Sequence, residues 1–97
     1  MKSTRLLTTA ETELLEAAEY YERQRPGVGR RFLDAVESAK VVLEHFPAIG
    51  TKQGKRFRSL DVQGFPYAVI YQVTPGECLI VAVAHTSRRP GYWKERL

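Results

Sequence analysis

The chain has 97 residues, of which 43% are hydrophobic, and its formal net charge is +4. This length allows a single domain, residues 1–97, and excludes two separate hydrophobic cores. The one cysteine, Cys78, excludes an intrachain disulfide. Because the chain has neither an apolar run of membrane-spanning length nor a signal peptide, we expect a cytoplasmic protein without a membrane partner.

The charges are distributed unevenly along the chain. Residues 1–44 carry seven bases and eight acids, whereas residues 45–97 carry eight bases and three acids. A basic half of this kind is typical of proteins that bind an acidic partner, either nucleic acid or an acidic protein. A small domain can also carry this charge without such a partner, so charge alone does not decide.

The first predicted elements are a short strand at residues 5–8 and a helix that follows it. Thr8 and Glu11 have the spacing of a capping box, which predicts that the helix begins there. Apolar residues then recur at helical spacing and predict one buried face. These residues are Leu14, Ala17, Ala18 and Tyr21. The five glutamates at positions 11, 13, 16, 19 and 22 are interpreted as a solvated face.

A second, longer helix is predicted after the turn at residues 26–29, Pro-Gly-Val-Gly. Its apolar residues recur at steps of three and four, and Pro47 ends it. They are Val28, Phe32, Val36, Ala39, Leu43 and Phe46. Because the turn is tight, the two helices should form an antiparallel hairpin that lies across one face of a sheet.

The second half of the chain predicts strands. Residues 48–55 are interpreted as a loop and residues 56–62 as a strand. Residues 65–73 and 78–85 predict a β-hairpin, because they are rich in β-branched and aromatic residues and Pro75-Gly76 suits a type II turn. The second arm is apolar on both faces, which indicates a strand inside the sheet. The predicted fold is α+β: a helical hairpin packed on a small, mainly antiparallel sheet, in the order β-α-α-β-β-β, followed by a basic tail.

The basic residues of this half are candidate contacts with a macromolecule. Arg56 and Arg58 lie two residues apart on a strand, so both should point to one face, where guanidinium groups suit phosphate or carboxylate. The tail adds Arg88, Arg89, Tyr92 and Trp93. If the strands pair as a meander, the tail and the arginine strand meet at one side of the sheet. For Trp93, packing onto the sheet is an equal alternative.

His85 ends the last predicted strand, close to arginines and tyrosines. Beside Tyr71 or Tyr92 it could transfer protons in RNA cleavage by 2′-hydroxyl attack, which needs no metal. The alternative is a hydrogen-bonded histidine at a strand end, and spacing alone favours it. The sequence has no phosphate-binding glycine loop, no Ser-His-Asp set and no metal-ligand spacing, so we expect neither a cofactor nor a metal.

Taken in order, these motifs resemble the RelE/ParE superfamily of type II toxin–antitoxin toxins over essentially the whole chain. The motifs are Tyr20-Tyr21, Pro26-Gly-Val-Gly29, Arg31-Phe-Leu33, Phe46-Pro47, Arg56, Phe65-Pro-Tyr67, Tyr71, Ala82-Val-Ala-His85 and Arg89-Pro-Gly-Tyr-Trp93. The resemblance implies a small antiparallel sheet backed by a helical hairpin. It also implies a toxin held inactive by a cognate antitoxin, which we expect to be acidic and amphipathic.

The superfamily has branches that differ in mechanism. RelE-like toxins cleave mRNA on the ribosome and typically carry an arginine three residues before the equivalent of Tyr71, where this chain has Ala68. His85 does match a catalytic position of that branch. ParE-like toxins inhibit DNA gyrase without a ribonuclease site, and Phe65-Pro-Tyr67 and residues 89–93 resemble this branch more closely. We therefore favour a ParE-like gyrase inhibitor. An mRNA endoribonuclease is the alternative, and a degenerate protein that only binds its antitoxin is a third.

Each interpretation predicts its own set of site residues. The macromolecule-binding residues of the favoured one are Arg56, Arg58, Tyr67, Tyr71, His85, Arg88, Arg89, Tyr92 and Trp93. The catalytic residues of the ribonuclease alternative would be Arg56, Arg58, Tyr71 and His85.

Overall fold

A computed structural model describes all residues, 1–97, as an α+β fold, which confirms the predicted fold class. The order of the elements is β-α-α-β-β-β-β, with one strand more than predicted. The elements are β1 (Ser3–Leu6), α1 (Thr8–Gln24), α2 (Val28–His45), β2 (Thr51–Gln53), β3 (Phe57–Asp61), β4 (Tyr67–Val73), β5 (Glu77–His85) and a short 3-10 turn at Lys94–Arg96. Neither helix is both long and apolar enough to cross a membrane.

The five strands form one sheet in the order β1-β5-β4-β3-β2. Only β1 is parallel to its neighbour, β5, and the other pairs are antiparallel. As predicted, β5 lies inside the sheet and is buried on both faces. Ile70 pairs with Ala82 while Tyr71 pairs with Ile80, so Val81 is an extra residue in β5. This bulge shifts the alternation of side chains in the second half of β5.

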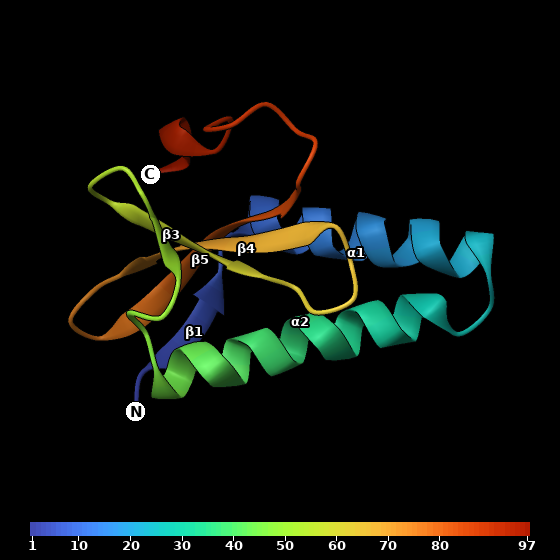
Figure 1. The fold of residues 1–97 in the computed structure, drawn as a ribbon, viewed down its shortest axis with the longest axis horizontal. Helices are drawn as coiled ribbons and strands as arrows, with labels where there is room; N and C mark the ends of the chain where they lie inside the picture. Colours follow the sequence, from blue (N-terminus) through green and yellow to red (C-terminus); the bar gives the residue numbers. More distant parts are fainter.

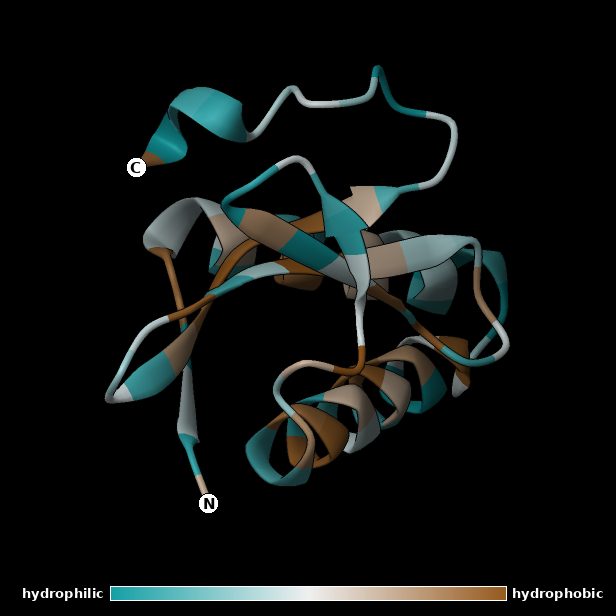
Figure 2. Ribbon diagram, turned by 60° about the vertical axis from the view of Figure 1, so that its left-hand side comes forward, coloured by the Kyte–Doolittle hydropathy of each residue, from teal (hydrophilic) through white to brown (hydrophobic).

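The sheet carries a hydrophobic core on each face. The helical hairpin covers one face, and the C-terminal tail (residues 86–97) crosses the other (Figure 1). Helix residues such as Phe32 and Leu43 pack with Tyr71 and Ile80 in the larger core. The smaller core joins strand residues to Trp93 of the tail. The final turn of the tail, Lys94–Arg96, is hydrophilic (Figure 2), and Lys94 and Glu95 are exposed.

The tight helical hairpin is confirmed, and its turn depends on two glycines. Gly27 has a φ of 92°, a left-handed conformation that suits glycine. The Glu22 carboxylate accepts hydrogen bonds from the backbone N–H groups of Gly27 and Gly29, at 3.0 and 3.1 Å, and thereby caps α2. A Cβ atom at Gly29 would lie 2.5 Å from the carbonyl oxygen of Ala18, so the two helices approach each other closely at this point.

Several local predictions were wrong in detail. Helix α1 begins at Thr8, but Leu7 is its N-cap and no side chain caps it. The Glu11 N–H donates to Leu7 O, so the first helical bond forms one residue earlier than the capping box requires. Phe46 was predicted in the apolar stripe of the second helix. It is 63% exposed, because α2 ends at His45.

The loops of the sheet also differ from prediction. Residues 51–53, expected in a loop, form the edge strand β2. Gly76 does not have the positive φ that a type II turn requires. Instead, the Thr74 N–H donates to Glu77 O at 2.9 Å, and the Thr74 hydroxyl accepts a hydrogen bond from the Glu77 N–H. The threonine side chain therefore closes this turn.

We predict that Gly29→Ala lowers the free energy of unfolding by about 1–3 kcal/mol, because the added methyl group overpacks the helix interface. Gly76→Ala is the matched control, since Gly76 has no atom within 4 Å of an added Cβ and its φ is not positive. Urea denaturation should show the control unchanged or slightly stabilised. Equal stabilities of the two variants would contradict the close approach of α1 and α2.

Candidate macromolecule-binding surface

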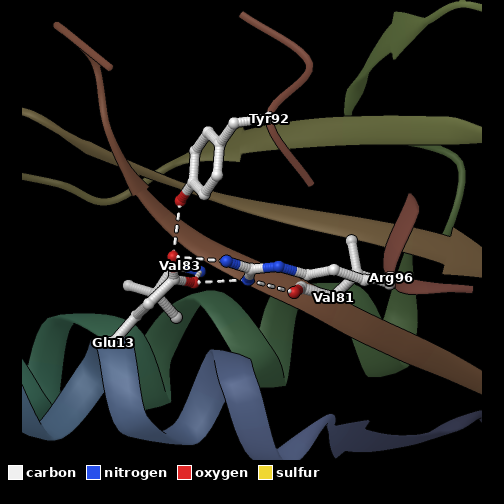
Figure 3. A network of polar contacts seen from close by, with 5 residues as sticks. All are labelled: Glu13, Val81, Val83, Tyr92 and Arg96. Atoms are coloured by element: carbon white, nitrogen blue, oxygen red, sulfur yellow. Dashed lines mark hydrogen bonds and ion pairs between the residues drawn. The ribbon is translucent and has the colours of Figure 1, made fainter. Parts of the chain in front are cut away.

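One edge of β5 has no strand partner over its second half. Strand β1 pairs with β5 only as far as Leu6 and Ile80, and the chain then turns into α1, whereas β5 continues to His85. Side chains take the place of a strand at this edge (Figure 3). The Val83 N–H donates to Glu13 Oε1 at 3.1 Å, and Arg96 Nη1 donates to Val81 O at 2.9 Å. The backbone N–H of Val83 and the carbonyl of Val81 thus have hydrogen-bond partners although no strand lies beside them.

The same carboxylate fixes the tail. Arg96 donates to both oxygens of Glu13, at 2.9 and 3.0 Å, and the Tyr92 hydroxyl donates to Oε2 at 2.7 Å (Figure 3). The Arg96 and Glu13 side chains are only 20% and 16% exposed. The guanidinium carbons of Arg88 and Arg96 lie 4.0 and 5.0 Å from the centre of the Tyr92 ring. The tail is therefore held by a bidentate ion pair and by cation–π stacking.

The network shifts the pKa values of its members in opposite directions. Burial alone would raise the pKa of Glu13, but the hydrogen bonds from Arg96, Tyr92 and Val83 outweigh burial and lower it. Burial, and then the hydrogen bond to Glu13, raise the pKa of Tyr92 to about 12. At neutral pH the carboxylate is charged and the phenol keeps its proton, as the bond between them requires.

A second group of cations surrounds a hollow of about 460 Å³ at the free edge of the sheet. Its lining residues are Lys52, Gly54, Lys55, Arg56, Phe57, Arg58 and Val73, and we call it the cationic hollow. None of its four cations forms an ion pair, and no carboxylate lines it. Arg58 Nη1 donates to Gly50 O at 2.8 Å, and Arg56 lies over the ring of Phe57.

His85 lies apart from this hollow. The Ser87 N–H donates to His85 Nδ1 at 3.0 Å, and the imidazole meets the Tyr67 ring edge-on at 5.0 Å. Arg88 and His85 line a different hollow, next to α1. In the sheet, His85 pairs with Tyr67 and Arg58 pairs with Tyr71. Four residues along β4 and two strand spacings place the Cα atoms of His85 and Arg58 roughly 17 Å apart.

The structure removes two predicted residues from the accessible surface. Tyr71 is 0% exposed, and its hydroxyl donates to Pro47 O at 2.8 Å and accepts from the Gly50 N–H at 2.9 Å. This side chain anchors the segment after α2 to the core. Trp93 is 6% exposed and packs in the outer core, so the packing alternative describes it correctly. Arg56, Arg88 and Arg89 are exposed, whereas Tyr67, His85 and Tyr92 are half-buried.

Sequence reasoning missed Glu13 and Arg96, the centre of the tail network. The predicted solvated face includes Glu13, although Glu13 lies three residues after the buried Ala10 and four before the buried Ala17. That spacing puts Glu13 on the inward side of α1 and was the available signal. Arg96 offered no local signal, because its partner is 83 residues away.

We predict that Glu13→Gln lowers the free energy of unfolding by about 1.5–3 kcal/mol at pH 7, because it leaves Arg96 half-buried without its charged partner. The folded-state pKa of Glu13 is lowered, so this stabilisation is present above the unfolded pKa and is lost as the pH falls through the folded one. The difference between variant and parent should therefore shrink toward pH 3.

Glu16→Gln is the control, because Glu16 is exposed one turn away on α1. Denaturation curves measured from pH 7 to pH 3 should show little change for this variant. If both variants have the same pH profile, the Glu13 network does not stabilise the fold.

Comparison with known proteins gives one family. A family model described as the ParE toxin of the type II toxin–antitoxin system, parDE, matches residues 5–90. Among solved structures, a chain of the chromosomal ParDE TA system from P. aeruginosa superposes with a TM-score of 0.76 at 16% sequence identity. The match covers 88% of this chain and 96% of that chain. At this identity the structural match shows a shared fold.

Proposed function

This chain belongs to the ParE family of type II toxin–antitoxin toxins, and we propose that it acts by binding DNA gyrase and blocking its activity, without a catalytic site of its own. A cognate antitoxin, as the family implies, would neutralise it by covering the toxin surface. The proposal joins the family match to one geometric observation, the separation of His85 from the cationic hollow.

This separation argues against the ribonuclease alternative. A proton-transfer group must lie within hydrogen-bond reach of the reacting atom, and charge-stabilising groups must lie beside the same atom. Here the Cα atoms of His85 and Arg58 are roughly 17 Å apart by strand register. Tyr71 is buried and fully hydrogen-bonded. Position 68, where RelE-like toxins typically carry an arginine, holds a buried alanine in the outer core.

We predict that the purified toxin inhibits gyrase supercoiling and does not cleave mRNA on translating ribosomes. His85→Ala should leave gyrase inhibition within about twofold of the parent, because a strand-end histidine contributes one contact among many. The measurements are a plasmid supercoiling assay and a primer-extension assay of ribosome-bound mRNA. Specific mRNA cuts that disappear in the His85 variant would instead establish the endoribonuclease. A protein that is inactive in both assays, and harmless when expressed without antitoxin, would be a degenerate antitoxin-binding member.

The antitoxin segment should be acidic and should lie against the exposed arginines at the start of the tail. Arg88 and Arg89 are both exposed, and Arg88 is held over Tyr92. Tyr67 and Tyr92, both half-buried beside them, offer apolar surface for an amphipathic partner. Opposite charges at such a rim mainly raise the rate and the salt dependence of association.

We predict that Arg88→Gln/Arg89→Gln weakens antitoxin binding about three- to tenfold, since exposed ion pairs contribute little each. The variant should also reduce the dependence of affinity on salt. Isothermal titration at 50 and 300 mM NaCl measures both quantities. Arg25→Gln/Arg31→Gln removes the same charge from two exposed residues at the helical turn and serves as the control. If parental affinity is independent of salt, the acidic contact does not exist.

A further inference from the structure

The β2–β3 hairpin forms the free edge of the sheet and carries an unbalanced group of charges. Strand β2 is the last strand of the sheet and pairs only with β3. The turn between them, residues 54–56, reads Gly-Lys-Arg, with Gly54 at a φ of 73°. The tip of this hairpin lies at the opposite end of the molecule from the turn between the helices (Figure 1).

Four cations meet in the cationic hollow beside this tip, and the protein supplies no counter-charge. They are Lys52, Lys55, Arg56 and Arg58. The ion pairs of the chain all lie outside the hollow, for example Glu77 with Arg5 and Glu13 with Arg96. Like charges held together without a partner repel one another, and an anion bound among them relieves that repulsion.

We propose that the β2–β3 hairpin, through the cationic hollow, binds the phosphate backbone of duplex DNA. A two-stranded β-ribbon is one of the two elements that the DNA major groove admits. Guanidinium and ammonium groups together suit phosphate oxygens, Arg as a fork and Lys as a point charge. The proposed contacts are to phosphate oxygens, which carry no sequence information, and the ring of Phe57 is buried and therefore cannot stack on a base.

This proposal goes beyond gyrase inhibition, because it gives the toxin a direct contact with nucleic acid. It does not require gyrase, although gyrase acts on DNA and the two contacts are compatible. Tail residues do not line the hollow, so DNA binding and the proposed antitoxin contact at Arg88 and Arg89 can be separated by mutation.

The test is fluorescence anisotropy of a labelled 16-base-pair duplex titrated with the full-length chain, without gyrase, from 25 to 200 mM NaCl. Each phosphate contact gives a slope of about −0.9 in log K against log salt, so four cations give at most about −3.6. Lys55→Gln/Arg56→Gln should reduce the magnitude of the slope by about 1.8 and weaken binding at least about tenfold at 50 mM NaCl. Both residues are exposed, and the one side-chain contact that the variant removes is that of Arg56 with the Phe57 ring, so the variant should fold normally.

Two controls keep the result specific to the hairpin. Arg25→Gln/Arg31→Gln removes the same charge at the far end of the molecule and should leave the slope unchanged. In ¹⁵N–¹H spectra of the parent, the duplex should shift the amides of residues 52–58 and not those of residues 25–31. Absence of binding at 25 mM NaCl, or equal slopes for both double variants, would overturn the proposal. So would a hollow that binds an acidic peptide but no duplex.

Discussion

The end of the sheet and the tail both depend on the carboxylate of Glu13. Strand β1 stops where the chain turns into α1, and this leaves the second half of β5 without a neighbour on that side. A partly buried strand edge needs donors and acceptors. Glu13 and Arg96 supply one of each and neutralise each other's charge. An ion pair here replaces a strand, and it joins α1, β5 and the tail at one point.

The position of the tail determines which surfaces remain accessible. Once Tyr92 and Arg96 are fixed at Glu13, Trp93 lies on the outer face of the sheet and buries it. The tail therefore covers part of that face and leaves a hollow of about 220 Å³, which Tyr92 and Trp93 line together with strand residues such as Ile70. The cations predicted to bind a partner remain accessible at two separate places, the cationic hollow at the free edge and Arg88 and Arg89 at the start of the tail.

Elements with an apolar pattern could be predicted from the sequence, and elements without one could not. The stripe of α2 and the two-sided apolar run of β5 predicted both elements, and the run also predicted that β5 lies inside the sheet. Strand β2 consists of Thr, Lys and Gln at a free edge, so it shows no alternation of polar and apolar residues. Its pairing partner β3 alone makes it a strand. Likewise, periodicity showed that Tyr71 lies on one face of β4, but not that two backbone groups of a distant loop bind its hydroxyl.

The distance between His85 and Arg58 bears on the choice between a binding surface and an active site more than their residue types do. Catalytic groups must converge on one reacting atom, and a separation of roughly 17 Å between the Cα atoms of His85 and Arg58 argues against such convergence. A protein interface has no such limit: roughly 800 Å² on each partner corresponds to a patch about 28 Å across. A binding surface therefore does not require these groups to converge, whereas an active site does.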